Sequence, residues 1–318
     1  MILPLNIDPK EFDKVYRLQF PLWQQAILQI CGEHDIPQNE IVPFADGSNL
    51  VASVADKYVF KIFPPFHRHQ WESEYRFLAA LQEKKTSIPI PKLVVSGKRP
   101  DQWFYVVITK LPGTTLENVW HQCSDREKSA ILEDIGRTMS VVHQLPIGQL
   151  KTIEPNWDSF VTAQLSSCLR RHTRLGMPIW FLREVETFVQ QNLPLLPSDF
   201  RSVILTGEYT PFNLMAEPGK SGWQLSGMID FGDAMVGYRE YDLLGPSLFL
   251  AQGNPDFIRS LFLGYGYSLA ELTPELRRRL MLLQILHRYS NFETQLRIPG
   301  WKVKVQSVSE LGQLIWPF

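Results

Sequence analysis

The sequence contains little cysteine and no long apolar run. Its 3 cysteines, Cys31, Cys123 and Cys168, lie far apart and form no C-x-x-C pair. This argues against a disulfide framework or a zinc site and favours a reducing, cytoplasmic setting. No uninterrupted apolar run approaches the roughly 18 residues of a membrane helix, and the N-terminus does not resemble a signal peptide. We therefore expect a cytoplasmic protein with no membrane partner.

An excess of charge of one sign is also missing. Lys and Arg together number 32 and Asp and Glu 33, which gives a formal net charge of −1. A dedicated nucleic-acid binder usually has a clear basic excess, so we expect no nucleic-acid partner. Hydrophobic residues make up 44% of the chain and charged residues 20%, which is typical of a globular protein. The length of 318 residues suggests two lobes or domains.

The pattern between residues 41 and 109 predicts about five strands and one helix. Runs of β-branched and aromatic residues alternate with turns, and the predicted helix follows the third run. The helix is predicted over 71–83, with Trp71, Tyr75, Leu78 and Leu81 on its apolar face. Helices are also predicted over 10–32. The predicted strands are 41–44, 50–54, 58–63, 92–96 and 103–108.

Beyond Leu111 the pattern becomes mainly helical. Short apolar pieces interrupt it, and two of them, 223–225 and 228–229, are predicted to form a strand pair. We therefore expect an α+β chain with an N-terminal lobe over 1–110 and a C-terminal helical lobe over 111–318. The other short strands are predicted at 202–205 and 214–215, and helices at 125–143, 157–192 and 254–292.

Two polar loops follow the short apolar pieces. The first contains Glu208 and Asn213, and the second contains Asp230 and is followed by Asp242. Carboxylate and amide oxygens at strand ends are hard ligands. They suit Mg²⁺, which takes one or two carboxylates and completes its shell with phosphates and waters.

With these loops the chain resembles the aminoglycoside phosphotransferase family, and its hygromycin-type members in particular. The family pattern is H-G-D-x-x-x-x-N followed by I-D-[FW]-[GS]-[DE]-A, and this chain reads T-G-E-Y-T-P-F-N and I-D-F-G-D-A. The resemblance covers residues 40 to 250. It implies a two-lobed protein-kinase-like fold, with a small antiparallel sheet lobe and a large helical lobe. It also implies an enzyme that uses ATP or another NTP with Mg²⁺ to phosphorylate a hydroxyl of a small molecule.

The resemblance assigns one group of residues to the nucleotide. Lys61 corresponds to the lysine that binds the α- and β-phosphates, and Glu74 to its ion-pair partner, with Glu72 as the alternative. The segment after the last strand of the sheet would bind the base through backbone groups, and a turn near residue 48 would cover the phosphates. The full set is Ser48, Asn49, Lys61, Glu74, Thr109, Lys110 and Leu111.

The same resemblance assigns the metal ligands and the catalytic group. Asn213 and Asp230 correspond to the metal ligands, and Glu208 stands at the position of the catalytic aspartate. Asp242 corresponds to a downstream aspartate that we expect to be structural. The implied chemistry is phosphoryl transfer, in which the hydroxyl is positioned and the charge of the transferring phosphate is neutralised.

This chain departs from the family pattern at three positions of the first loop. Thr206 replaces histidine, Glu208 replaces aspartate, and Phe212 replaces a small residue. The extra methylene of Glu208 moves the carboxylate by about 1.5 Å, and a misplacement of about 1 Å can cost about 100-fold in rate. Three outcomes follow: an active kinase with a shifted substrate, a slow kinase, or a nucleotide-binding pseudokinase with a sensing or scaffold role. A protein kinase is disfavoured because no A-P-E-like segment follows Asp230.

The remaining polar features are expected to be structural. His143 ends an apolar helix face and is expected to pack there, and the run Arg277 to Arg279 is expected to be a solvated helix face. We expect the acceptor pocket among the helices of 157–192 and 254–292. No motif in these segments identifies the acceptor, and the sequence leaves the oligomeric state open.

Overall fold

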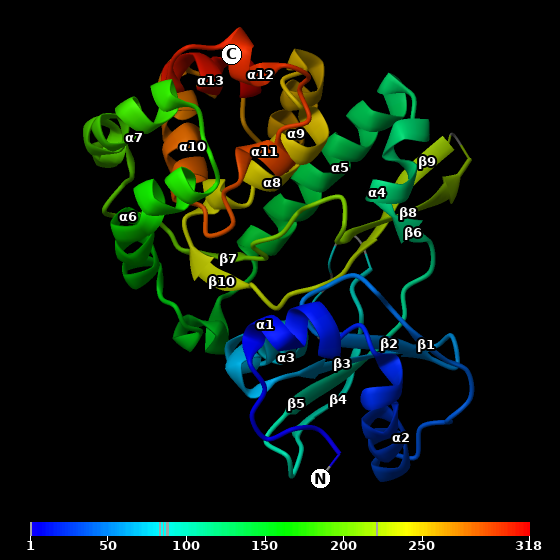
Figure 1. Ribbon diagram of the computed structural model, residues 1–318. Coiled ribbons are helices and arrows are strands. Elements are labelled where there is room, and N and C mark those ends of the chain that lie inside the picture. Colours follow the sequence, from blue (N-terminus) through cyan, green and yellow to red (C-terminus); the bar gives the residue numbers. More distant parts are fainter. Residues whose placement is uncertain (1, 83, 85, 87–88, 221) are drawn as a thin grey trace. The chain divides into compact units, whose positions relative to one another are not determined.

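The computed structural model describes residues 2–82, 84, 86, 89–220 and 222–318, which form parts of two compact units (Figure 1). Unit 1 comprises Met1–Lys85, Ile90–Pro112 and Asp230–Asp233. Unit 2 comprises Thr86–Pro89, Gly113–Ile229 and Ala234–Phe318. The short segment 230–233 therefore packs with unit 1, although both of its flanking segments belong to unit 2.

Unit 1 contains a five-stranded antiparallel sheet, as the sequence predicts. The strand order is β1-β2-β3-β5-β4, which places β3 in the centre (Figure 1). In this register Lys61 of β3 lies between Val51 of β2 and Val106 of β5. The strands are β1 (Ile41–Pro43), β2 (Leu50–Val54), β3 (Tyr58–Phe63), β4 (Leu93–Lys98) and β5 (Phe104–Thr109).

The helices of unit 1 pack around this sheet. Side chains of α2, including Ile27 and Ile30, share one apolar core with Phe60 of β3 and with Trp103. The helical stretch predicted over 10–32 is broken near Pro21, which has no backbone N–H to donate. The helical elements are α1 (Pro9–Glu11), the π-helical turn Phe12–Tyr16, the 3₁₀ turns Phe20–Leu22 and Pro65–His67, α2 (Gln24–Glu33) and α3 (Arg68–Leu81).

The apolar face predicted for α3 is wrong at two of its four positions. Leu78 and Leu81 are buried, but Trp71 and Tyr75 are partly exposed. The indole of Trp71 stacks on Phe104 at 4.5 Å and donates a hydrogen bond to Ser96 Oγ at 2.9 Å, so it covers the surface of the sheet. The buried side of α3 is instead formed by Gln70, Ser73, Glu74, Phe77, Leu78 and Leu81.

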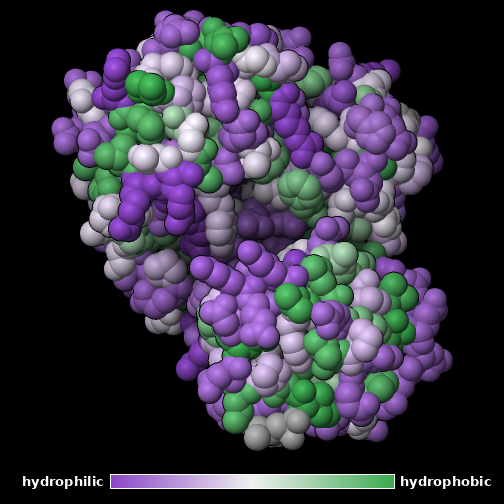
Figure 2. All heavy atoms as spheres, viewed as in Figure 1, coloured by the Kyte–Doolittle hydropathy of each residue, from purple (hydrophilic) through white to green (hydrophobic). Residues whose placement is uncertain are grey.

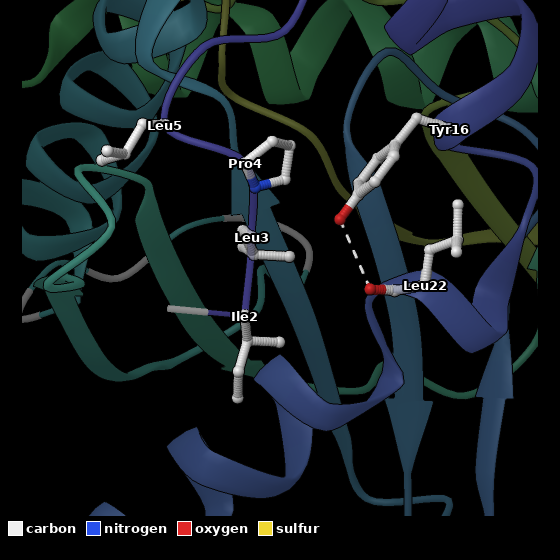
Figure 3. A pocket seen from close by; sticks show the side chains of 6 residues that line it. All are labelled: Ile2, Leu3, Pro4, Leu5, Tyr16 and Leu22. Atoms are coloured by element: carbon white, nitrogen blue, oxygen red, sulfur yellow. Dashed lines mark hydrogen bonds between the residues drawn. The ribbon is translucent and has the colours of Figure 1, made fainter.

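Unit 1 also has an open apolar pocket near the N-terminal end of the chain (Figure 3). Its volume is about 460 Å³, and Tyr16 Oη donates a hydrogen bond to the carbonyl of Leu22 at 3.3 Å. Its lining has no charged side chain, so it does not suit the phosphates of a nucleotide. Figure 2 shows apolar and polar side chains intermixed on the face of unit 1 that it presents. The residues that line the pocket are Ile2, Leu3, Pro4, Leu5, Tyr16 and Leu22.

Unit 2 is mainly helical, and the contact between α5 and α9 is extensive. Ile131, Ile135, Met139 and Val142 of α5 are buried, as predicted. A Cβ atom at Gly136 would lie 2.3 Å from the carbonyl oxygen of residue 261, so only glycine permits this approach to α9. The longer helices are α5 (Asp125–Gln144), α6 (Trp157–Arg174), α7 (Ile179–Asn192), α9 (Pro255–Tyr265), α10 (Pro274–Leu286) and α13 (Val308–Ile315).

Shorter helical elements connect these helices. Within the described residues, no helix is long and apolar enough to cross a membrane. The short α-helices are α4 (Leu116–Val119), α8 (Leu244–Pro246), α11 (Phe292–Gln295) and α12 (Trp301–Lys304). The other turns are Trp120–Gln122, Gly148–Thr152, Leu193–Leu195, Arg239–Tyr241, Ser247–Ala251 and Leu269–Glu271.

Two small antiparallel sheets complete unit 2. One has the order β6-β8-β9 and the other pairs β10 with β7. The strand pair predicted over 223–225 and 228–229 is wrong, because β9 is one continuous strand. A register shift opposite it, between Met215 and Ala216, lets the whole strand pair with β8. The strands are β6 (Thr114–Thr115), β7 (Val203–Leu205), β8 (Leu214–Gly219), β9 (Gly222–Met228) and β10 (Met235–Gly237).

Candidate active site

A lysine between two carboxylates forms the charged cluster of unit 1. Lys61 Nζ lies 2.8 Å from Glu74 Oε2 and 2.9 Å from Asp230 Oδ1. The side chain of Glu74 is fully buried, whereas that of Asp230 is 43% exposed. Glu72, the alternative partner, instead pairs with Arg76 one helical turn away. The structure therefore places Glu74, and not Glu72, against the lysine.

The fold of unit 1 explains how Asp230 reaches this cluster. The ring of Phe231 stacks on Phe77 of α3 at 4.4 Å, and its backbone N–H donates to Glu74 Oε2 at 3.3 Å. Asp230 has a φ of +65°, in the left-handed region that aspartate tolerates better than most residues. Its Oδ1 accepts a hydrogen bond from the backbone N–H of Gly232 at 3.4 Å as well as from the lysine. These contacts hold the segment 230–233 on α3.

The charges in the cluster adjust one another's pKa values. Burial lowers the pKa of Lys61, but the carboxylates of Asp230 and Glu74 outweigh burial and raise this pKa above its ordinary value. Burial raises the pKa of Glu74 to about 7, although Lys61 acts in the opposite direction. For Asp230, the charge of Lys61 outweighs burial and lowers the pKa. The lysine is therefore charged at neutral pH, and the partly exposed Asp230 is ionised.

The two predicted phosphate-covering residues differ in their surroundings. Ser48 is exposed, whereas Asn49 is buried and donates hydrogen bonds to Ser48 Oγ at 3.2 Å and to Gln70 Oε1 at 3.0 Å. The Asn49 Oδ1 atom lies 2.9 Å from His67 Nδ1. The asparagine side chain therefore connects the turn to the start of α3, and a nucleotide would meet backbone groups of this turn.

The predicted base-binding segment begins at Thr109, the last residue of strand β5, and continues beyond the strand. The backbone N–H of Thr109 donates to the carbonyl of Lys92 at 3.0 Å, and that of Lys110 donates to the carbonyl of Lys57 at 2.8 Å. The Lys110 side chain pairs with Asp56, and Leu111 is partly buried. Two backbone donors of this segment are therefore engaged inside unit 1.

In unit 2 the predicted catalytic and metal-binding residues lie in one loop, residues 206–213, which we call the acid–amide loop. The amide Nδ2 of Asn213 donates to Glu208 Oε2 at 2.7 Å, and the side chain of Asn213 is nearly buried. Backbone hydrogen bonds close the turn, since Asn213 N–H donates to the carbonyl of Thr210 at 3.1 Å. This amide orientation, assigned from the hydrogen bonds, leaves Asn213 Oδ1 as the oxygen that a metal ion would use.

A buried aspartate holds the beginning of the acid–amide loop. Asp242 accepts hydrogen bonds from the backbone N–H groups of Thr206 at 3.0 Å and of Gly207 at 2.9 Å. Gly207 has a φ of +78°, which glycine adopts at little cost. The third partner of Asp242 is His143 Nε2 at 3.1 Å, a contact that the sequence analysis did not predict. A histidine on an otherwise apolar helix face was the only signal for it.

One other expectation changed in unit 2. The run Arg277 to Arg279 is not a uniformly solvated face, because Arg279 makes a two-pronged ion pair with Glu240 at 2.6 and 2.7 Å. Glu240 is fully buried, so it requires a cation beside it. Phe212 remains 47% exposed, and its ring meets Phe249 edge to face at 5.8 Å.

The donor chemistry of Asp230 and Asn213 suits Mg²⁺. Each offers an oxygen atom, and the Asp230 carboxylate is partly exposed and ionised. Within the described part of the chain, no group of three or more His, Cys, Asp or Glu side chains is arranged to hold a metal ion. In proteins, Mg²⁺ takes one or two carboxylates and obtains its other ligands from phosphates and waters.

The fold is kinase-like, and comparison with known proteins gives the family of this chain. The profile of the phosphotransferase enzyme family matches residues 40–280. The match covers well over half of the chain, so the chain belongs to this family. The predicted family and the prediction of an enzyme of the small-molecule kinase class are confirmed.

Solved structures and one curated relative agree with this assignment. The GDP complex of wild-type aminoglycoside 2′-phosphotransferase-IIIa is 18% identical, with a TM-score of 0.68 over 92% of this chain and 98% of that chain. The streptomycin–ATP–APH(2″)-IIa ternary complex is 20% identical, with a TM-score of 0.60 over 85% and 92%. These likenesses confirm the predicted fold class.

The curated relative is hydroxylysine kinase from Danio rerio. It is 29% identical over 148 residues, which are 43% of this chain and 39% of the relative. The chain therefore matches about two fifths of that relative's length.

Proposed function

We propose that this protein transfers the γ-phosphoryl group of ATP to a hydroxyl group of a small molecule. The observation that carries the proposal is the buried Lys61–Glu74 pair, with its ions 2.8 Å apart, in a chain of the phosphotransferase enzyme family. In the reaction, the acceptor hydroxyl oxygen bonds to the γ-phosphorus while the bond to the β–γ bridging oxygen breaks. ADP leaves, and the hydroxyl proton passes to a carboxylate of the protein.

In this proposal, the predicted N-terminal lobe, residues 1–110, binds the nucleotide. Lys61 neutralises the α- and β-phosphates and Glu74 fixes the position of the ammonium group, because a buried cation needs a fixed partner. The carbonyl groups of Thr109 and Lys110, with Leu111, contact the base, since both N–H groups of the first two are engaged elsewhere. Backbone N–H groups of the turn at Ser48 and Asn49 contact phosphate oxygens.

The region over 111–318 contributes the acid–amide loop. Glu208 orients the acceptor hydroxyl and takes its proton, and its bond from Asn213 at 2.7 Å fixes the longer side chain in one position. Asn213 and Asp230 would hold Mg²⁺, which neutralises phosphate charge when it is bound. This fixed carboxylate supports an active kinase with a shifted acceptor over the nucleotide-binding pseudokinase, which neither the family match nor the similar structures favour.

The test measures nucleotide binding and acceptor-dependent ADP release separately. Binding of MgATP and MgGTP is measured by calorimetry. ADP release is then followed with hydroxylysine, other hydroxylated amino acids, sugars and aminoglycosides as acceptors. We expect MgATP binding and turnover with at least one acceptor, and hydroxylysine is the first to test because of the similar curated kinase.

Glu208→Gln separates the proposal from the pseudokinase alternative. This variant should bind MgATP as the wild type does but lose about 10²- to 10⁴-fold in acceptor-dependent turnover, the usual contribution of a general base. Glu217→Gln, in strand β8 of the same unit, is the matched control and should keep full activity. MgATP binding without turnover on any acceptor would favour the pseudokinase, and loss of nucleotide binding would refute both.

A further inference from the structure

A chain of hydrogen bonds leads from helix α9 through helix α5 to the acid–amide loop. Tyr265, the last residue of α9, places its Oη 2.9 Å from His143 Nδ1, near the end of α5. The other imidazole nitrogen, Nε2, lies 3.1 Å from Asp242 Oδ2. Asp242 in turn accepts the backbone N–H groups at the start of the loop. One buried imidazole therefore connects two helices to the segment that presents Glu208.

The side chains that form this chain of hydrogen bonds are buried, so the loss of any one of the bonds is costly. The side chain of His143 is 3% exposed and that of Asp242 is fully buried. A carboxylate removed from water must be compensated by hydrogen-bond donors. For Asp242 these donors are the imidazole and two backbone N–H groups, with Thr206 Oγ1 at a marginal 3.5 Å. Removal of the imidazole leaves the aspartate with fewer donors, and the backbone of the loop then loses a fixed acceptor.

The direction of the hydrogen bonds follows from Asp242, whose Oδ2 already accepts the backbone N–H of Thr206. We therefore assign the proton of His143 to Nε2, which donates it to Asp242, and the Tyr265 hydroxyl then donates to Nδ1. Burial raises the pKa of Tyr265 to about 12, so this hydroxyl keeps its proton at neutral pH. The close approach of α5 and α9 at Gly136 and Gly264 fixes the two rings relative to each other.

We propose that His143 and Tyr265 are positioning residues for phosphoryl transfer. They hold Asp242, and Asp242 holds the acid–amide loop so that Glu208 meets the acceptor hydroxyl. The imidazole in contact with Asp242 comes from α5, and Thr206 of the loop contributes its backbone N–H to the same carboxylate. The catalytic part of this inference rests on the proposed function, whereas the positioning part concerns the loop itself.

Three variants remove different parts of the chain of bonds. His143→Leu removes both imidazole bonds, His143→Gln keeps an N–H near the place of Nε2, and Tyr265→Phe removes only the hydroxyl. Hydrogen exchange of the backbone N–H groups of Thr206 and Gly207 is the first readout, and kcat and KM for MgATP with the best wild-type acceptor are the second. A role confined to general stability would not change these two amides selectively.

We expect His143→Leu to speed exchange of these amides about tenfold or more, and to lower kcat about 10- to 100-fold with an unchanged KM for MgATP, as a misplaced catalytic group does. His143→Gln should restore most of both, and Tyr265→Phe should show a smaller change in the same direction. The matched control is Tyr105→Phe, since Tyr105 Oη makes the same kind of bond to His34 Nε2 at 2.7 Å in unit 1. This control should leave both readouts unchanged.

Unchanged exchange of Thr206 and Gly207 in folded His143→Leu would overturn the proposal. If that variant does not fold, unchanged exchange of the same two amides in Tyr265→Phe would overturn it equally. A wild-type protein that consumes no ATP would contradict the proposed function. The exchange result still decides whether the imidazole positions the loop, so the two failures are distinguishable.

Discussion

The two polar clusters of this protein are stabilised in different ways. In unit 1, Lys61 is held by two carboxyl groups within 2.9 Å, so attraction between opposite charges stabilises the cluster. In unit 2, the acid–amide loop is held by Asp242 through backbone N–H groups and an imidazole. A substitution that removes one of these three groups in unit 1 therefore leaves the remaining charges of the cluster unbalanced. A substitution among the groups that hold the acid–amide loop in unit 2 instead alters the position of the loop and leaves the charges of the loop the same.

Removal of the lysine should have the largest effect on stability. Lys61→Ala leaves Glu74 and Asp230 together without their cation, and breaking a buried pair typically costs about 3–5 kcal/mol. Urea unfolding followed by tryptophan fluorescence measures this loss. Lys110→Ala is the control, since it breaks an exposed pair with Asp56 and should cost less than about 1 kcal/mol. Equal losses of unfolding free energy in the two variants would contradict the claim that burial makes the Lys61 pair costly to break.

Shortening the carboxylate of Glu208, the proposed catalytic group, tests whether the loop is adapted to glutamate. Glu208→Asp withdraws the carboxylate from Asn213 Nδ2, now 2.7 Å away, and should lower acceptor-dependent turnover about 100-fold. Stability should change little, because the loop stays anchored by Asp242. The measurements are kcat on the best acceptor and the urea midpoint. A faster enzyme would show that glutamate is a poor substitute in this loop.

The close contact between α5 and α9 should be sensitive to one added methyl group. Gly136→Ala places a Cβ 2.3 Å from the carbonyl of residue 261, and such overpacking costs about 1–3 kcal/mol. Gly32→Ala in α2 is the matched control, because its nearest neighbour would be a side-chain nitrogen at 3.8 Å. The control should be neutral or stabilising by about 0.5–1 kcal/mol, since alanine favours helix. Thermal unfolding of both variants checks the contrast.

A pH dependence would sharpen the contrast between charged and neutral buried groups. Burial lowers the pKa of His172 to about 4 from an ordinary 6.5. Between these two pKa values the unfolded chain binds a proton at this position and the folded chain does not. The stability contributed by the neutral ring is therefore lost as the pH falls from 6.5 towards 4. His172→Phe should reduce the dependence of the urea midpoint on pH over this range. An unaltered dependence would refute the assignment.

Much of unit 1 could be predicted because its sequence signals are local. Strands β1 to β5 follow from runs of β-branched and aromatic residues between turns, and Lys61 stands out as a charge within such a run. The buried face of α3 could not be predicted from apolar spacing. Glu74 occupies an inward position only because the lysine compensates its charge, and Trp71 covers the sheet through its ring and its N–H.

The unit 2 site was only partly predictable for a similar reason. The spacing of Glu208 and Asn213 is visible in the sequence, but their mutual hydrogen bond depends on the fold of the turn. His143 lies 99 residues from Asp242, so only the packing of α5 brings them together. A periodic apolar pattern predicts that such a helix is buried, but it does not predict which distant polar group its last turn will meet.

The placement of residues 230–233 has a consequence for how the chain acquires its structure during synthesis. Unit 1 receives Asp230 and Phe231 only after most of unit 2 has been translated. Until then the sheet can form with Lys61 paired to Glu74 alone, and the ring of Phe77 lacks its stacking partner. The charged cluster of Lys61, Glu74 and Asp230 is thus completed only after residue 230 has been translated, although its other two members lie within the first 74 residues.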